Sequence, residues 1–215
     1  MRLLPPVIAI ALALSLIAGC DAGNGLDKVN GSVNVPAGMH AAEAHTVNGA
    51  ITIDHDAVVG SVRTVNGAVS LGAKAKAQSL KTVNGSIRLD AGAAVSGEVV
   101  AVNGGINMAA GSAVTGRVVN VNGAIKLDQA TIGGGIETVN GDVTIGSGST
   151  VHGGLLVRRP QGMLGTTAGK PRIVIAAGAV VDGTLRFERP VDLQVAADAK
   201  VGAIVGATPN TASAR

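Results

Sequence analysis

Short runs of alternating apolar and polar residues recur along the chain after residue 20. Within residues 46–63, the apolar side chains stand at Val47, Ile51, Ile53, Val58 and Val62. Alternation with a period of two over so few residues indicates short β-strands with one buried face. Helical spacing is not sustained after residue 20, and the dominant Gly, Val, Asn and Thr are poor helix formers. The pattern therefore predicts an all-β fold.

The pattern repeats with a fixed period, marked by the tripeptide Val-Asn-Gly. Its asparagines, 18 or 19 residues apart, are Asn30, Asn48, Asn66, Asn84, Asn103, Asn122 and Asn140. A fixed period of this length is typical of a solenoid, in which each repeat is one coil stacked on its neighbours. We therefore predict a parallel β-helix with about 18 residues per coil.

Corners between the strands can also be read from the repeat. Asn48-Gly49 forms the first, because Asn tolerates left-handed backbone and Gly favours it. Residues 54–56 form the second, and we expect a third, softer corner near Arg63-Thr64. The fifth coil has an extra residue, which we place in its corner at residues 109–112. Three strands and three corners per coil predict a triangular cross-section.

Stacked coils would place the seven asparagines in one row. At a strand spacing of ~4.8 Å, their carboxamides can donate and accept hydrogen bonds in a continuous ladder. We interpret the row as a structural Asn ladder, with a ligand-binding face as the alternative. Thr46, Thr64, Thr82 and Thr138 also share a phase, in a pattern that resembles ice-binding solenoids. Ala101 and Asn120 interrupt that pattern.

The chain divides into four predicted segments. Residues 1–19 read as a signal peptide, with cationic Arg2, an apolar stretch too short to span a membrane, and small residues before Cys20. Residues 20–27 form a tether, residues 28–207 the β-helix, and residues 208–215 a polar tail. Residues 158–172 lack the tripeptide and contain two prolines, so we interpret them as a basic loop that projects from the rod.

Composition limits the function classes. The chain has no Trp or Tyr and a single Phe, so its interior should be narrow and filled by aliphatic side chains. Its formal charge of +3 gives no basic field of the kind that nucleic-acid binding needs. Cys20 is the only cysteine, which excludes an intramolecular disulfide. We expect no nucleic-acid partner.

The residues that could carry chemistry do not assemble into a known motif. The histidines His40, His45, His55 and His152 lie at different phases and lack zinc-site spacing. Asp54, Asp90 and Asp128 share a phase where calcium could bind, but other coils interrupt the row. The coils are too small for the cleft of a polysaccharide lyase. We expect no catalytic residue, no metal, no cofactor and no enzymatic activity.

The best candidate contact site is the basic loop. Its cations are Arg158, Arg159, Lys170 and Arg172. Guanidinium and ammonium groups could meet the cell wall or an anionic envelope polymer. The alternative is a solvated excursion that covers the end of the rod.

Ile17-Ala18-Gly19-Cys20 resembles the bacterial lipobox. This resemblance implies cleavage before Cys20, diacylglycerol on its sulfur and an acyl group on its new amine. The membrane, reached through acylated Cys20, is then the first expected partner. Asp21 resembles an inner-membrane retention signal, although the destination membrane stays open. We expect a cell-envelope lipoprotein that faces the periplasm.

The motif Ala-Val-x-Gly-x-Val, at residues 57–62 and 113–118, resembles the repeat of bactofilins, which are polymer-forming bacterial scaffold proteins. The Val-Asn-Gly half of each repeat is similar to adhesin-like β-helix domains of bacterial envelope proteins. Together the resemblances cover about residues 28–207, and they imply a right-handed triangular β-helix.

These observations lead to one main expectation and two alternatives. The main expectation is a non-enzymatic, lipid-anchored scaffold or adhesin-like spacer. One alternative is a bactofilin-like polymer, formed by end-to-end self-association of unpaired strand edges. The other is a cell-wall or carbohydrate-binding module.

Overall fold

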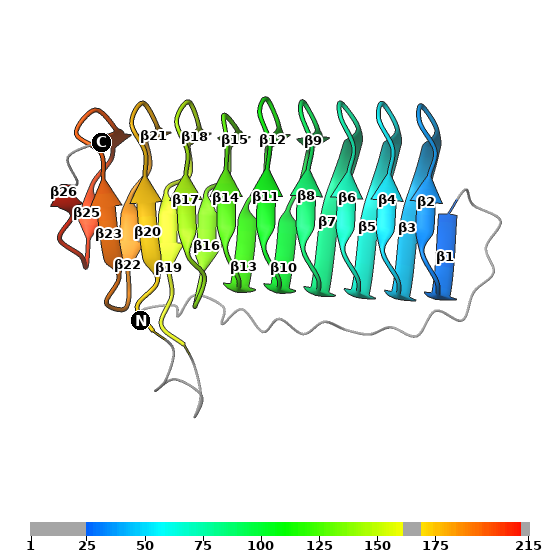
Figure 1. The fold of residues 1–215 in the computed structure, drawn as a ribbon, viewed down its shortest axis with the longest axis horizontal. Coiled ribbons are helices and arrows are strands. Elements are labelled where there is room, and N and C mark those ends of the chain that lie inside the picture. Colours follow the sequence, from blue (N-terminus) through cyan, green and yellow to red (C-terminus); the bar gives the residue numbers. More distant parts are fainter. Residues whose placement is uncertain (1–24, 161–168, 212–215) are drawn as a thin grey trace, which may run out of the picture.

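The chain folds into one continuous β-solenoid, which confirms the all-β prediction (Figure 1). The computed structural model describes residues 25–160 and 169–211. Every strand pair in this part of the chain is parallel, and each coil lies directly on the one before it. The register places Asn48 on Asn30 and Asn66 on Asn48, so each tripeptide marks one full turn.

One side of the solenoid is a ten-stranded sheet with one strand from each coil. Its strands are β2 (Val33–Val35), β4 (Ile51–Ile53), β6 (Val69–Leu71), β8 (Ile87–Leu89), β11 (Ile106–Met108), β14 (Ile125–Leu127), β17 (Val143–Ile145), β20 (Arg172–Ile175), β23 (Asp192–Val195) and β26 (Asn210–Thr211).

The rest of each coil belongs to a sixteen-stranded sheet. The first coils contribute single strands, which are β1 (Gly25–Asn30), β3 (His40–Asn48), β5 (Val58–Asn66) and β7 (Lys76–Asn84). Beyond β7 the sheet divides into two columns. One holds β9 (Ala94–Val95), β12 (Ala113–Val114), β15 (Thr131–Ile132), β18 (Thr150–Val151), β21 (Val180–Val181) and β24 (Lys200–Val201). The other holds β10 (Val99–Asn103), β13 (Val118–Asn122), β16 (Ile136–Thr138), β19 (Leu155–Val157), β22 (Leu185–Phe187) and β25 (Ile204–Val205).

An inserted residue causes this division. Val95 pairs with Ala77 and Val99 pairs with Leu80, so residues 96–98 contain one residue more than the coil before. The next coil keeps the insertion, because Val114 pairs with Val95 and Val118 with Val99. The placement of the extra residue at 109–112 is therefore wrong. The corner expected near Arg63-Thr64 is also wrong, since β5 runs straight through it.

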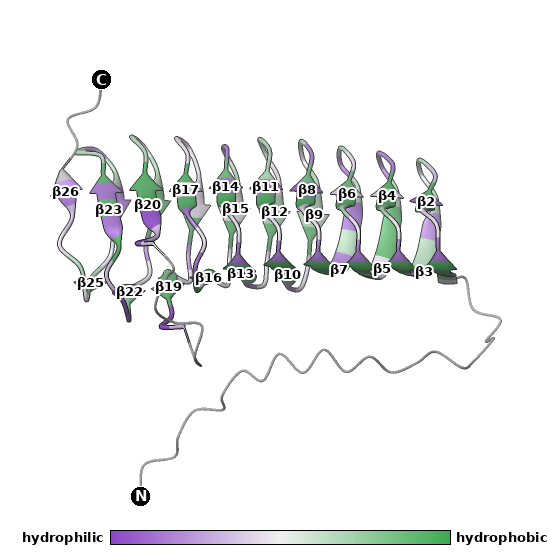
Figure 2. Cartoon of the chain, turned by 60° about the horizontal axis from the view of Figure 1, so that its bottom comes forward, coloured by the Kyte–Doolittle hydropathy of each residue, from purple (hydrophilic) through white to green (hydrophobic). Residues whose placement is uncertain are grey.

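The core is a narrow aliphatic column. Side chains of one register, such as Ile87, Ile106 and Ile125, stack on each other and are fully buried. Hydrophobic segments accordingly recur in the strands of successive coils (Figure 2). Phe187 is buried near the C-terminal end. Apart from Phe187, aliphatic residues and Met108 make up the buried hydrophobic core, in agreement with the absence of Trp and Tyr from the chain.

The threonine row faces the core rather than solvent. Thr46, Thr64 and Thr82 are buried. Each hydroxyl donates a 3.0 Å hydrogen bond to the carbonyl of the corner glycine one coil earlier. Asn120 takes this place in a later coil, where its Nδ2 donates to Gly104 O at 2.7 Å while its buried Oδ1 has no partner. The threonine row thus connects each coil to the corner of the coil before it by hydrogen bonds, and it is not an exposed ice-binding surface.

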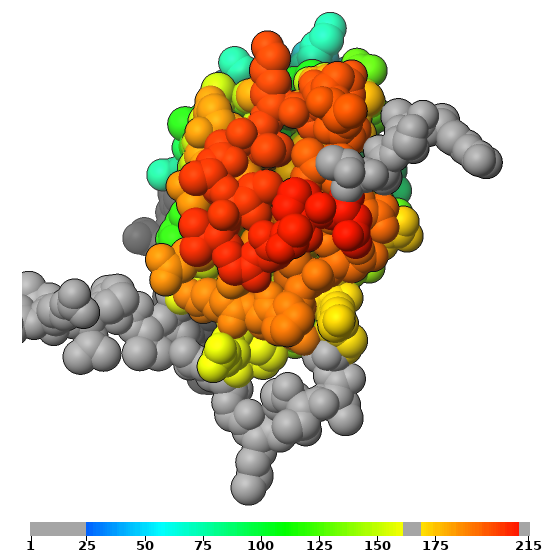
Figure 3. Space-filling model, turned by 90° about the vertical axis from the view of Figure 1, so that its left-hand side faces the viewer, coloured from blue at the N-terminus to red at the C-terminus, as the bar shows by residue number. Residues whose placement is uncertain are grey.

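The ordered solenoid is slightly longer than the predicted one. Strand β1 begins at Gly25, ahead of the expected start at Lys28, and β26 extends the ladder to Thr211. Within the described residues, unpaired strand edges lie at both ends, on β1 and β2 at the N-terminal end and on β24, β25 and β26 at the other. Figure 3 looks onto the C-terminal end, where the last described residues form much of the end surface.

Close stacking explains the glycine of the repeated tripeptide. A Cβ on Gly85 would overlap the carbonyl of Gly67, and a Cβ on Gly67 would overlap that of Gly49. These three glycines do not have positive φ, so the left-handed backbone expected there is wrong. Positive φ does occur at the second corner, at Asp56. The repeat thus requires glycine at the first corner because the backbone below occupies the place of a side chain.

We expect Gly85→Ala to lower the free energy of unfolding by about 3 kcal/mol, because backbone atoms of two coils must separate. Gly169→Ala is the matched control, since a Cβ there meets nothing within 4 Å. Urea unfolding followed by circular dichroism measures both. Equal stabilities of the two variants would contradict the close approach.

Candidate functional site

The seven predicted asparagines form one row along the rod, in which the first six are exposed and Asn140 is half-buried. Each Nδ2 donates to the Oδ1 of the asparagine one coil earlier, at 2.8–3.0 Å, from Asn140 to Asn30. A carboxamide has two N–H donors and an oxygen with two lone pairs. Each interior asparagine therefore keeps one N–H and one lone pair for solvent or for a polar ligand.

Arg189 closes the ladder at its C-terminal end. Its Nη1 donates to Asn140 Oδ1 at 2.5 Å and to Val139 O at 3.1 Å, and its Nη2 donates to Gly169 O at 3.0 Å. Because all the carboxamides point the same way, this cation sits at the acceptor end of an aligned chain and strengthens it. Sequence reasoning missed Arg189, which lies in a coil without the tripeptide.

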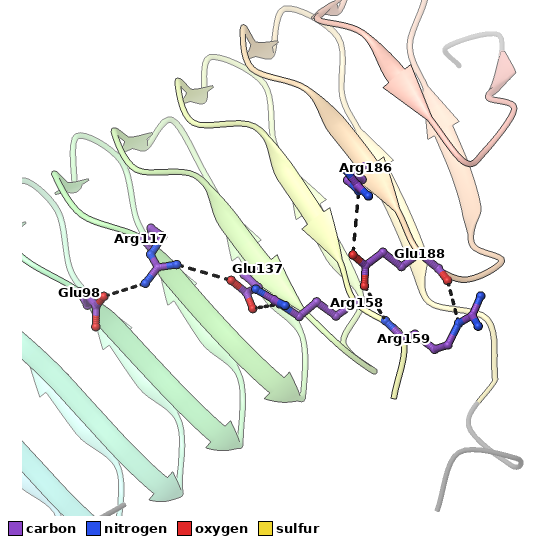
Figure 4. A network of polar contacts seen from close by, with 7 residues as sticks. All are labelled: Glu98, Arg117, Glu137, Arg158, Arg159, Arg186 and Glu188. Carbon is purple, nitrogen blue, oxygen red and sulfur yellow. Dashed lines mark hydrogen bonds and ion pairs between the residues drawn. The ribbon is translucent and has the colours of Figure 1, made fainter. Parts of the chain in front are cut away.

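A second ladder, of alternating charge, crosses the outer face of β10, β13, β16 and β19 (Figure 4). Arg117 lies between two carboxylates, 3.2 Å from Glu98 and 3.7 Å from Glu137. Arg158 donates through Nε to the other oxygen of Glu137. The side chain of Glu137 is only 9% exposed, so this carboxylate depends on its two cations. Coil-by-coil alignment could have found only the first pair, because Glu98 and Arg117 are one 19-residue period apart, whereas Glu137 shares its register with Val119 and Leu156.

The charged ladder borders a shallow hollow of about 430 Å³. Its lining includes Gly134, Gly135 and Gly153 together with Arg158 and Arg186. These two arginines have carboxylate partners: Arg158 pairs with Glu137, and Arg186 lies 3.9 Å from Glu188. The hollow is therefore a mixed-charge groove and offers hydrogen bonds rather than a strong cationic field.

The four cations of the predicted basic loop do not form one cluster. Arg159 contacts Glu188 through its backbone N–H and through Nε. Arg172 belongs to β20 in the other sheet, where its Nη2 donates to Gln194 Oε1 at 3.1 Å. Lys170 is exposed, and residues 161–168 lie outside the described part of the chain.

The histidines lie at separate places on the surface. His45 stands between Asp27 and Glu43, at 3.5 and 3.6 Å. His152 contacts Asp182 at 2.6 Å, and His55 contacts its neighbour Asp56. Within residues 25–160 and 169–211, no three His, Cys, Asp or Glu side chains converge on a point where they could hold a metal ion. Cys20 lies outside the described residues.

The Asn ladder predicts unequal costs for two alanine substitutions. Asn84→Ala removes two ladder bonds and should cost about 2 kcal/mol of unfolding free energy, at ~1 kcal/mol per bond. Asn30→Ala removes one bond, at the end of the row, and should cost about half as much. Urea unfolding measures both. A cost for Asn84→Ala no larger than that for Asn30→Ala would show that the bonds contribute little.

Glu137→Gln should destabilise the rod by about 2 kcal/mol, because it leaves Arg117 and Arg158 without their shared carboxylate. Glu98→Gln is the control, since the side chain of Glu98 is 42% exposed and surface ion pairs contribute less than about 1 kcal/mol. Thermal unfolding at low and high salt compares the two. Equal effects would exclude a special role for Glu137.

Comparison with known proteins identifies no relative, so the proposed function rests on the fold and on the geometry of the surface. No helix among the described residues has the length and apolar character needed to cross a membrane. No protein-family model matches the chain, and neither curated proteins nor solved structures give a significant match.

Proposed function

We propose that the protein is a lipid-anchored, non-enzymatic rod of the bacterial cell envelope that acts as a scaffold or spacer. One observation carries this proposal: in each polar row of the repeat, the side chains form hydrogen bonds or ion pairs with groups of the neighbouring coils. The asparagines bond to asparagines, the threonines to corner carbonyls, and Arg117 to Glu98 and Glu137. Such rows stiffen a rod, and they leave few side chains free for catalysis.

The dimensions of the solenoid suit a spacer. Ten strands stacked at ~4.8 Å give a rod of about 45 Å. Because each coil contacts only its neighbours, the number of coils fixes the length. The resemblance to bactofilins and to adhesin-like envelope domains supports an architectural role, and it remains part of the proposal.

The proposed anchor is acylated Cys20, five residues before β1. Two or three acyl chains, at about 0.8 kcal/mol per buried methylene, hold a protein stably on a membrane. The lipobox-like residues 17–20 support this anchor and a periplasmic location for the proposed lipoprotein.

Growth of cells with labelled palmitate tests the anchor. The wild-type protein should carry the label and sediment with membranes, whereas Cys20→Ser should lose the label and leave the membrane fraction. Asp21→Ser is a control that keeps the acylated residue, and it should still be labelled. An unlabelled wild-type protein in the soluble fraction would refute the anchor.

A further inference from the structure

We infer that the N-terminal coil rests on the lipid bilayer, so that the rod stands on its N-terminal end and carries its C-terminal end away from the membrane. This inference rests on the proposed lipid anchor. It concerns the coil of residues 25–39, which contains β1 and β2 and forms the N-terminal end of the solenoid in Figure 1.

This end carries most of the exposed large hydrophobic side chains of the described chain. They are Leu26, Val29 and Met39, at 38%, 68% and 52% exposure, whereas Val205 is the one exposed at the opposite end. Leu26 stands over buried Ala44 in the register of the sheet, which is a core position. Among the described residues no coil lies before β1, so this core position is exposed, and a covering surface would complete the core.

The charges of this coil do not oppose contact with lipid. Residues 25–39 contain only two charged side chains, Asp27 and Lys28. Asp27 Oδ1 lies 3.5 Å from His45 Nδ1, and Lys28 Nζ donates to Ser32 O at 2.8 Å. Both groups thus have partners on the rod, which reduces the desolvation cost at an interface.

The tether brings the bilayer to this end. Gly25 lies five positions after Cys20, and an extended chain of this length spans at most ~18 Å. Acyl chains on Cys20 would therefore hold β1 near the headgroups. The unpaired N–H and C=O groups of β1 and β2 require hydrogen-bonding partners, which headgroups and their water supply and hydrocarbon does not. The coil should lie at the interface, with Leu26, Val29 and Met39 toward the lipid.

A second copy is the competing occupant of the same edge. Stacking of β1 on β25 of another copy would also cover Leu26, because both strands belong to one register column. The short tether favours the membrane, since it holds lipid next to this edge in every molecule and leaves little room for another rod.

Single tryptophans test the orientation, because the natural chain contains none. The lipidated Val29→Trp protein is reconstituted in phosphatidylcholine vesicles, and lipidated Val205→Trp serves as the control at the far end. Circular dichroism confirms that both fold. We expect a blue-shifted emission for Val29→Trp and quenching by brominated acyl chains at least about twofold stronger than for Val205→Trp.

Water-like emission and weak quenching in both variants, on protein that sediments with the vesicles, would overturn the orientation and leave the anchor intact. Strong quenching in both would mean that the rod lies flat, which also overturns it. A blue shift of Val29→Trp without vesicles that grows with protein concentration would assign the edge to a second copy. If the wild type fails to sediment, as Cys20→Ser should, the proposed anchor fails and the inference falls with it.

Discussion

In-register backbone pairing between successive coils is the interaction on which this molecule depends. A parallel ladder fixes which residues lie above one another, and every row of side chains follows from it. Asn66 can donate to Asn48 only because their Cα atoms are partners in β5 and β3. The same register stacks Thr64 on Thr46 and Ile106 on Ile87. Each side-chain hydrogen bond contributes a modest free energy of folding. These contributions add up because the backbone register repeats the same contact in successive coils.

This dependence makes the fold sensitive to local changes in chain length. The residue added between Val95 and Val99 is absorbed without loss of register on either side, and it divides the long strand into two shorter ones. The first corner also accepts extra residues, since the register is kept on both sides of residues 158–171. Its side chains are restricted, because carbonyl groups of the preceding coil fill the space beside Gly67 and Gly85. Coil length can vary at the bend, whereas the chemistry of the first corner is restricted.

The period of the sequence predicted the stack, the strands and the row of asparagines, because a period of about 18 residues directly states which residues are superposed. It did not predict which side chains before the first corner face the core. Thr46 and Thr64 therefore looked like surface residues, although they lie in β3 and β5 with their side chains on the buried face. Composition indicated a basic loop, but its arginines pair with Glu137 and Glu188 of the coils directly before and after, at positions outside the repeated motif that the period does not reveal. Arg189 was missed for the same reason.

The proposed envelope role depends on a straight rod with one strand spacing per coil, and spin-label distances test this geometry most directly. In a Cys20→Ser background, the substitutions Thr52→Cys and Lys126→Cys put spin labels at outward positions of β4 and β14. Gln194→Cys gives a more distant label position on β23. Pulsed electron resonance should give ~19 Å for the pair at 52 and 126 and ~34 Å for the pair at 52 and 194, as expected for four and seven spacings of ~4.8 Å. Distances that do not grow in proportion to the number of coils would contradict the rod.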